Sequence, residues 1–261
     1  LTKSFLYSNA MFWLKYFHVD GFRVDAVSNI IYYLGNPANG VNEGACDFLR
    51  GLSRNLFAYD DRVLLMAEDS SAHDGVTRPV DMGGLGFNYK WNMGWMNDTL
   101  RYFKLDPIYR KYHHNLITFG LVYAFSEQFI LPLSHDEVVH LKASLLNKMP
   151  GDYWQKFANY RALMGLMMTH PGKKLLFMGG EFAHYTEWNF KKELDWNLYK
   201  YPAHDSANRF VRDMIATYRR EKALFSSDHK KEGFEWIEGN NSEQSIFVFA
   251  RYSEKFDDHV V

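Results

Sequence analysis

The sequence has little cysteine, little net charge and no run of apolar residues typical of a membrane span, and each shortage excludes a class of protein. The single Cys46 rules out an internal disulfide and a multi-cysteine metal site, which suits a reducing compartment. A formal net charge of −1 leaves no excess of basic residues for a nucleic-acid backbone or an acidic membrane surface. With 47% hydrophobic residues, we expect a soluble, cytoplasmic globular protein with a large core.

The first 17 residues are apolar enough to be mistaken for a targeting sequence. Lys3, Asn9 and Lys15 interrupt them, and no small-residue cleavage pattern follows. Their apolar residues are spaced to form one broad stripe on a helix. We therefore expect an amphipathic helix that leads directly into a strand at Gly21.

Three apolar segments end in acidic residues. In segment 21–27, side chains that alternate along a strand would place Arg23 and Asp25 on one face. Taken alone, this pattern indicates no more than a structural ion pair at a strand end. Segments 63–69 and 129–137 repeat the arrangement, however, and each ends in carboxylates. A shared polar site is the better interpretation of all three.

The three acids in question are Asp25, Glu68 and Asp136. In parallel α/β folds, and above all in (β/α)₈ barrels, catalytic residues lie at the C-terminal ends of several different strands. A βα repeat of such a barrel takes roughly 30 residues, and the spacing of these acids fits one repeat with a long loop followed by two more. Converging carboxylates are what glycosidic chemistry requires.

The hydrophobic pattern along the chain predicts an α/β fold. Beyond Lys222 it changes to period two around a Gly239-Asn240-Asn241 turn, which is typical of a β-hairpin. Five parallel strands are found where a closed barrel needs eight. We therefore expect strands four to eight of a TIM (β/α)₈ barrel in residues 1–225, a truncated β-sandwich domain in 226–261, and an internal fragment of a longer protein. The expected elements are helices 3–17, 45–57, 96–103, 152–169 and 205–222, strands 21–27, 63–68, 86–91, 129–136 and 174–179, and hairpin strands 234–237 and 245–251.

The motifs at these strand ends resemble the α-amylase superfamily of retaining α-glucan enzymes: Gly-Phe-Arg-Val-Asp-Ala-Val from Gly21, Met-Ala-Glu-Asp-Ser from Met66 and Leu-Ser-His-Asp-Glu-Val-Val-His from Leu133. Three further stretches, 84–96, 148–152 and 171–179, are similar to the bacterial 1,4-α-glucan (glycogen) branching enzymes. This resemblance extends from about residue 5 to residue 250.

The resemblance implies a role for each site residue. Asp25 would be the nucleophile, Glu68 the general acid/base and Asp136 the carboxylate that stabilises the transition state, while Arg23 and His135 would contact oxygens of the donor sugar. The reaction would cleave an α-1,4-glucan such as glycogen or amylose and transfer the segment to a C6 hydroxyl of an acceptor chain. No cofactor, metal, nucleic acid or membrane is implied, and the oligomeric state is left open.

The chain departs from the family pattern at two positions and lacks one motif. Asn97 stands where the family commonly has histidine, and Leu141 replaces a glycine after His140. Neither change removes a carboxylate, so we interpret both as variation in chain-length preference. The family's first motif, whose Asp and His complete the donor site, has no counterpart in these residues.

Two other functions remain open. An α-glucan hydrolase or debranching enzyme of the same superfamily would carry the same three acids. A noncatalytic glucan-binding scaffold, or an inactive fragment, belongs to another class, although a scaffold has no need of three acids at strand ends. For the 261 residues alone we expect negligible activity and poor solubility, because strands 21–27 and 174–179 would be unpaired sheet edges.

Three local patterns favour structural interpretations. His135 and His140 are five residues apart, whereas a zinc helix of the metalloprotease type places its histidines four apart, so a metal site is not expected. The Gly83–Gly86 segment lacks the strand-to-helix setting of a dinucleotide loop and predicts a turn with close backbone approach. Glu181, after the last strand, suits either a cleft or a loop contact equally well.

Overall fold

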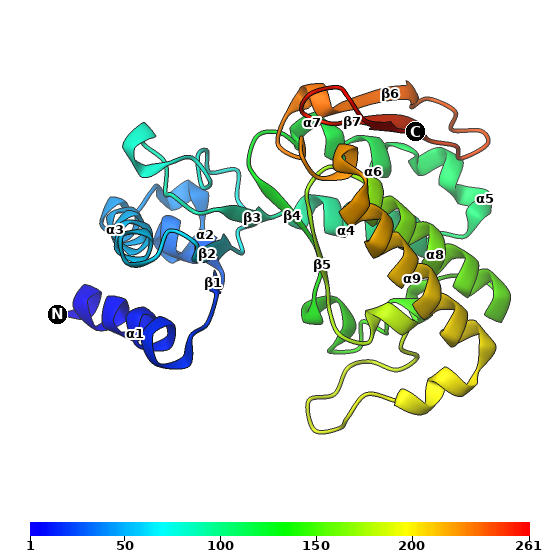
Figure 1. Cartoon of the computed structure of the whole chain (residues 1–261), viewed down its shortest axis with the longest axis horizontal. Coiled ribbons are helices and arrows are strands. Elements are labelled where there is room, and N and C mark those ends of the chain that lie inside the picture. Colours follow the sequence, from blue (N-terminus) through cyan, green and yellow to red (C-terminus); the bar gives the residue numbers. More distant parts are fainter. The chain divides into compact units, whose positions relative to one another are not determined.

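The computed structural model describes all residues from 1 to 261 and divides into two compact units (Figure 1). The first comprises residues 1–93 and 127–130, and the second comprises residues 94–126 and 131–261. The predicted boundary near residue 225 concerns domains of a longer protein and stays a prediction.

The first unit alternates helices with short parallel strands. Its helix α3 begins where the Asn42 side chain accepts a hydrogen bond from the N–H of Ala45, and it buries one stripe that includes Leu49, Leu52 and Leu56. The elements of this unit are α1 (Thr2–Phe17), β1 (Gly21–Val24), α2 (Val27–Ile31), η1 (Tyr33–Gly35), η2 (Pro37–Asn39), α3 (Glu43–Tyr59), β2 (Leu64–Ala67), η3 (Val80–Met82) and β3 (Tyr89–Trp91).

The strands of the first unit pair in parallel and in sequence order. Gly21 pairs with Leu64, where an added β-carbon would lie 2.1 Å from the carbonyl oxygen of Leu64, so only glycine fits. β2 pairs with β3, and β3 pairs with the start of β4 (Phe129–Leu133). Figure 1 shows α2 and α3 next to β1 and β2, and side chains of these four elements share one core with Val76, Leu85 and Phe87.

The second unit is built around two long helices. Asp152 and Gln155 form a reciprocal cap at the start of α8, and α8 ends at Thr169, just before Pro171, as the sequence predicts. Figure 1 shows α8 and α9 side by side. The helical elements of this unit are α4 (Met93–Lys104), α5 (Pro107–Arg110), η4 (Lys111–His113), α6 (Asn115–Thr118), α7 (Gly120–Tyr123), η5 (His135–Val138), η6 (Leu146–Lys148), α8 (Tyr153–Thr169), η7 (Gly180–Phe182), η8 (Trp196–Lys200), α9 (Pro202–Arg220), η9 (Lys222–Leu224) and η10 (Lys231–Gly233).

Strand β5 (Lys173–Leu176) completes a five-stranded sheet with the order β1-β2-β3-β4-β5. The five parallel strands expected from the sequence are therefore confirmed. The order also makes β1 and β5 the two edges of that sheet. No helix is both long enough and apolar enough to cross a membrane.

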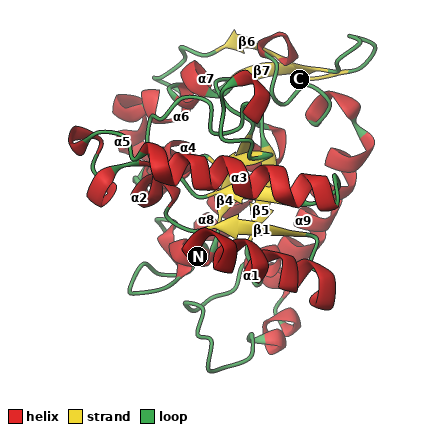
Figure 2. Ribbon diagram, turned by 90° about the vertical axis from the view of Figure 1, so that its left-hand side faces the viewer, coloured by secondary structure: helices red, strands yellow, loops and turns green.

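The predicted hairpin is present and carries a third strand. β6 (Phe234–Glu238) pairs antiparallel with β7 (Val248–Tyr252), which pairs with β8 (His259–Val260). Figure 2 shows β6 and β7 apart from β5. The second hairpin strand begins at Val248 and not at residue 245, because Ser245 adopts a left-handed conformation with φ of 54°. On β6, a bulge between Trp236 and Glu238 also shifts the register of the pairing with β7.

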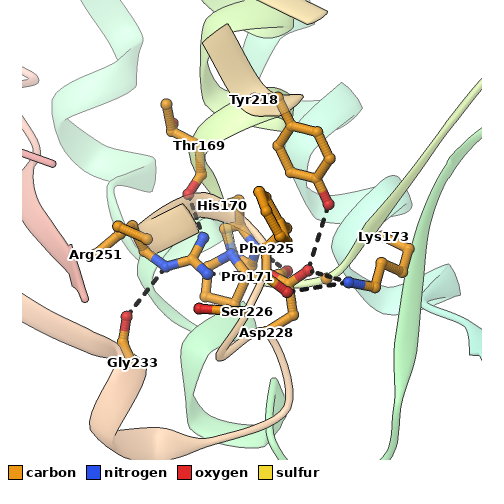
Figure 3. A network of polar contacts seen from close by, with 12 residues as sticks. Thr169, His170, Pro171, Lys173, Tyr218, Phe225, Ser226, Asp228, Gly233 and Arg251 are labelled. Atoms are coloured by element: carbon orange, nitrogen blue, oxygen red, sulfur yellow. Dashed lines mark hydrogen bonds and ion pairs between the residues drawn. The ribbon is translucent and has the colours of Figure 1, made fainter. Parts of the chain in front are cut away.

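A buried ion pair holds β7 against the end of α8 (Figure 3). The guanidinium of Arg251 donates to Asp228 Oδ1 at 2.9 Å and to the carbonyl oxygens of Thr169 at 2.6 Å and Gly233 at 3.1 Å. The other oxygen of Asp228 contacts Lys173 Nζ at 3.1 Å. The side chains of Arg251 and Asp228 are 1% and 6% exposed, so neither charge has water as a substitute partner.

The parallel strands are shorter than the sequence pattern suggests. β1 ends at Val24 and not at residue 27, because Ala26 adopts the left-handed conformation and α2 begins at Val27. β4 ends at Leu133 because Ser134 caps the helical turn η5. The acids expected at strand ends therefore stand one to three residues beyond the last paired residue.

Candidate active site

In the first unit, Arg23 lies between the acids that follow β1 and β2. Its Nη2 atom is 2.8 Å from Asp25 Oδ1 and 2.9 Å from Glu68 Oε2. Since one nitrogen contacts both oxygens, their separation cannot exceed these two distances together. That limit is compatible with the spacing of about 5 to 5.5 Å between the carboxyl groups of retaining glycosidases. The structure therefore brings together three of the five predicted site residues.

The two acids differ in their exposure to solvent. The side chain of Asp25 is 75% exposed, whereas that of Glu68 is 20% exposed. Glu68 Oε2 also accepts a hydrogen bond of 2.9 Å from the backbone N–H of Ala26. Both carboxylates contact Arg23, but Asp25 faces solvent, where a substrate carbon could reach it, while Glu68 is also held by the main chain.

The main chain fixes the two strand ends relative to each other. The Glu68 N–H donates to the carbonyl of Val24, and the Val27 N–H donates to the carbonyl of Glu68, at 3.0 and 2.8 Å. Ala26, between these contacts, has φ of 47°, a left-handed conformation that costs a residue with a β-carbon about 1–2 kcal/mol. Backbone strain of this kind is often found at functional sites.

An aromatic ring supports the arginine. The guanidinium carbon of Arg23 lies 4.4 Å from the ring centroid of Trp91, which is 4% exposed at the end of β3. A buried cation–π contact of this kind contributes on the order of 1–2 kcal/mol. Trp91 thus orients the cation that contacts both acids.

In the second unit, His135 and Asp136 lie together in η5. His135 Nε2 is 3.4 Å from Asp136 Oδ1, and the two side chains are 39% and 41% exposed. The Ser134 cap and the buried Glu137 carboxylate fix this turn, because Glu137 Oε2 accepts from both the N–H and the hydroxyl of Ser134, at 2.8 and 2.7 Å. Asp136 and His135 therefore both stand at the C-terminal end of β4.

Aromatic rings and a strained loop flank this pair. The His135 ring lies 5.9 Å from that of Phe177 and 6.4 Å from that of Trp188. In the following loop, His140, Leu141 and Ala143 have φ values of 55°, 65° and 63°. Leu141 is 98% exposed, and its conformation explains why a glycine would suit this position.

Glu187 and Lys148 hold the strained loop in place. Glu187 accepts the N–H groups of Leu141 and Ala143, at 3.2 and 2.6 Å. Lys148 Nζ donates to the carbonyls of Lys142 and Ala143, and burial lowers its pKa to about 8. The ammonium of Lys142 in turn donates to the Asp136 carbonyl at 2.8 Å. Sequence reasoning identified neither Glu187 nor Lys148 as a support for this loop, because neither lies in a strand-end motif.

The structure clarifies two local patterns. At Gly84 an added β-carbon would lie 2.0 Å from the carbonyl oxygen of Arg78, so the Gly83–Gly86 segment is the expected turn with close backbone approach. Glu181 Oε2 accepts the N–H of Gly179 at 2.7 Å and thus supports its own loop. No group of three or more His, Cys, Asp or Glu side chains is arranged to hold a metal ion.

The comparisons with known proteins agree with the motifs. No family model matches the chain. The 1,4-alpha-glucan branching enzymes GlgB of Bacillus mycoides (strain KBAB4) and Bacillus cereus (strain AH820) are each 57% identical to it over 260 residues. These matches cover 100% of this chain and 40% of either relative.

Among solved structures, a pullulanase from Bacillus acidopullulyticus matches with a TM-score of 0.69 and 16% sequence identity, over 96% of this chain and 32% of that one. At that identity the likeness concerns the fold, and it confirms the predicted part-barrel of parallel strands and helices followed by an antiparallel sheet. The predicted resemblance to the bacterial 1,4-alpha-glucan branching enzymes is likewise confirmed along the whole of this chain, which spans about two fifths of their length.

Proposed function

We propose that this chain carries the catalytic carboxylates of a glycogen branching enzyme. The observation that carries the proposal is the single Arg23 nitrogen placed between Asp25 and Glu68 at the ends of adjacent parallel strands. The identity of 57% to enzymes named for α-glucan branching supports the choice of reaction and of α-glucan as the substrate class. The single buried Cys46 suits the reducing cytoplasm as the proposed compartment.

The reaction begins with Asp25 attacking the anomeric carbon of an α-1,4-linked glucose. As the bond from that carbon to the glycosidic oxygen breaks, Glu68 gives its proton to the departing oxygen, and a glycosyl ester forms on Asp25. Asp136 stabilises the positive charge that develops on the sugar ring. Arg23 and His135 contact donor-sugar oxygens, and no metal or cofactor takes part.

The second step joins the transferred segment to another chain. A C6 hydroxyl attacks the anomeric carbon of the ester, Glu68 accepts the hydroxyl proton, and Asp25 leaves as a free carboxylate. The product is an α-1,6 branch. Transfer is faster than hydrolysis only if the acceptor chain is held in place and water is kept from the ester. The outcome therefore depends more on how the acceptor is positioned than on the three acids.

A chimaera tests the proposal, because the chain spans only part of its relatives. The 261 residues replace the matching part of the Bacillus cereus branching enzyme, and the purified protein is incubated with amylose. Branching is expected to shift the iodine colour with few new reducing ends and to produce linkages that an α-1,6-specific hydrolase cleaves. New reducing ends without such linkages would show a hydrolase and overturn the proposal.

Matched variants assign the roles within the chimaera. Asp25→Asn, Glu68→Gln and Asp136→Asn are each expected to lower the rate by at least about 1,000-fold, on the scale found when single catalytic groups are removed. Asp74→Asn is the control, because Asp74 is 76% exposed in an ion pair with Arg78 and should leave the rate unchanged. The 261-residue chain by itself is expected to have negligible activity. Near-normal branching by it would contradict that expectation.

A further inference from the structure

Directly after Glu68, a second carboxylate is buried in an ion pair with a strand lysine. Lys90 Nζ lies 2.8 Å from Asp69 Oδ2, and the two side chains are 7% and 0% exposed. Lys90 Nζ also donates to the carbonyl oxygen of Ser71 at 2.8 Å. Asp69 accepts the N–H of Ser71 at 2.9 Å and its hydroxyl at 3.0 Å. These contacts form a closed network around residues 69–71.

The position of this network relates it to the acid/base residue. Asp69 lies two residues beyond the end of β2, outside the paired strand, and its carboxylate contacts Lys90 on β3. Lys90 is in register with Ala67, so these two side chains point to the same side of the sheet. On its other side, the backbone of Glu68 bonds to Val24 at the end of β1 and to Val27 at the start of α2. The backbone at Glu68 is therefore fixed directly from β1 and α2, and from β3 through Asp69.

Stability alone is a weak reason for this pair. Burial removes the hydration of both charges, and this cost largely offsets their attraction. Replacing such a pair by apolar residues of similar size often leaves the stability of a protein unchanged or raises it. The contacts of Lys90 do fix the shape of the turn, because its ammonium bonds both Asp69 and the carbonyl of Ser71 and so holds these two residues in one arrangement. The turn immediately follows the residue whose carboxyl must meet the glycosidic oxygen.

We propose that Lys90 is a positioning residue for Glu68: through Asp69 and Ser71 it fixes the turn after β2, and so aligns the carboxyl that transfers the proton. This inference rests on the proposed function of Glu68 as general acid/base. Lys90 does not touch the substrate. Its loss should therefore impair the step that needs a proton from Glu68 and spare a step that does not.

Two donors separate these cases in the same chimaera. Amylose needs protonation of its departing glycosidic oxygen, whereas an α-maltosyl fluoride releases fluoride ion without a proton. In Lys90→Met, which keeps the length of the side chain and removes the charge, kcat on amylose is expected to fall about 100-fold, the loss that a displacement of about 1 Å produces. Initial release of fluoride from the activated donor is expected to change less than about threefold. Lys90→Arg, which keeps the charge, should recover part of the amylose rate.

A charge-balanced variant guards against a simple folding defect. Lys90→Met alone leaves Asp69 buried without its cation, so Lys90→Met is also combined with Asp69→Leu, which removes both charges. If Lys90 positions Glu68, the double variant regains stability in urea and keeps the amylose defect. Equal loss on both donors, or recovery of the amylose rate in the double variant, would show a purely structural role and overturn the inference.

The experiment also separates this inference from the proposed function. A parent chimaera that branches amylose but whose Lys90→Met variant loses both activities alike refutes the inference and leaves the proposed function intact. A parent that acts on neither donor refutes the proposed function, and the role of Lys90 falls with it. Lys104→Met serves as a control for the loss of a lysine charge, because Lys104 is exposed at the end of α4.

Discussion

Replacing Arg251 by methionine should release β7 from the end of α8. The substitution keeps much of the apolar stem and removes a guanidinium with three acceptors: Asp228 Oδ1 and the carbonyls of Thr169 and Gly233. All three would lose their donor in a setting where the arginine side chain was 1% exposed. Asp228 would keep its contact with Lys173 at 3.1 Å, so its charge would not be left alone.

These contacts set the expected magnitude. Breaking a buried ion pair by removing one partner typically costs 3–5 kcal/mol. Since Lys173 still faces the Asp228 carboxylate, we expect the lower end of that range, about 3 kcal/mol. If the free energy needed to open β7 locally falls by about 3 kcal/mol, the open state becomes about 100-fold more populated, because each 1.4 kcal/mol corresponds to a factor of ten. Removing both charges, in Arg251→Met with Asp228→Leu, should cost far less than the single change.

Hydrogen exchange in the chimaera measures this opening directly. Amides of β7, residues 248–252, should exchange about 100-fold faster in Arg251→Met. Exchange should be clearly slower than that in the double variant, although the carbonyls of Thr169 and Gly233 still lack their donor there. Lys230→Met is the control: Lys230 pairs with Glu254 at the surface, where such pairs contribute little. Unchanged exchange in Arg251→Met, or a double variant that is worse than the single one, would refute the reasoning.

Three further outcomes are expected. Burial lowers the pKa of His170 from its ordinary value of about 6.5 to about 3. Between these two pH values the unfolded chain binds a proton at His170 and the folded chain does not. Stability in urea should therefore fall as the pH drops from 6.5 toward 3, and His170→Phe should lack this component. Leu141→Gly should raise the free energy of unfolding by up to about 1 kcal/mol, because it relieves the left-handed strain at this position. Leu141→Ala keeps the β-carbon and should bring no such gain. A glycine variant less stable than the parent would contradict this. The fully buried Cys46 should react with a thiol reagent only on unfolding, and rapid labelling of the native chain would argue against its burial.

Much of the fold could be predicted because its helices carry strong periodic signals. The capped start of α8 and the proline just beyond its end are both visible in the sequence. Strand ends were placed less well, since an apolar run continues past the last paired residue. At Ala26, nothing in the residue type indicates the left-handed conformation that ends the extended segment.

The candidate site could also be predicted from the sequence only in part. Arg23 and Asp25 could be paired from their spacing alone, because alternation along a strand is a local rule. The contact from Arg23 to Glu68 joins segments 45 residues apart and depends on which strands are neighbours. Lys90 was missed for a related reason: a lysine inside an apolar strand is unusual, but its partner Asp69 is recognisable only once β2 and β3 are paired.

The hydrogen bonds that tie Glu68 to Val24 and Val27 have a consequence for how such a protein can diverge. They fix the two acids through residues close to the strand ends, and the long connections that follow, 32–42 and 72–86, lie outside these bonds. Under the proposed function, insertions or replacements at the exposed positions of those connections, away from the core residues Val76 and Leu85, could alter which sugar chains are held while leaving the carboxylates where they are. Under that function, the reaction and the choice of substrate would be carried by separate stretches of sequence, and each could evolve without rebuilding the other.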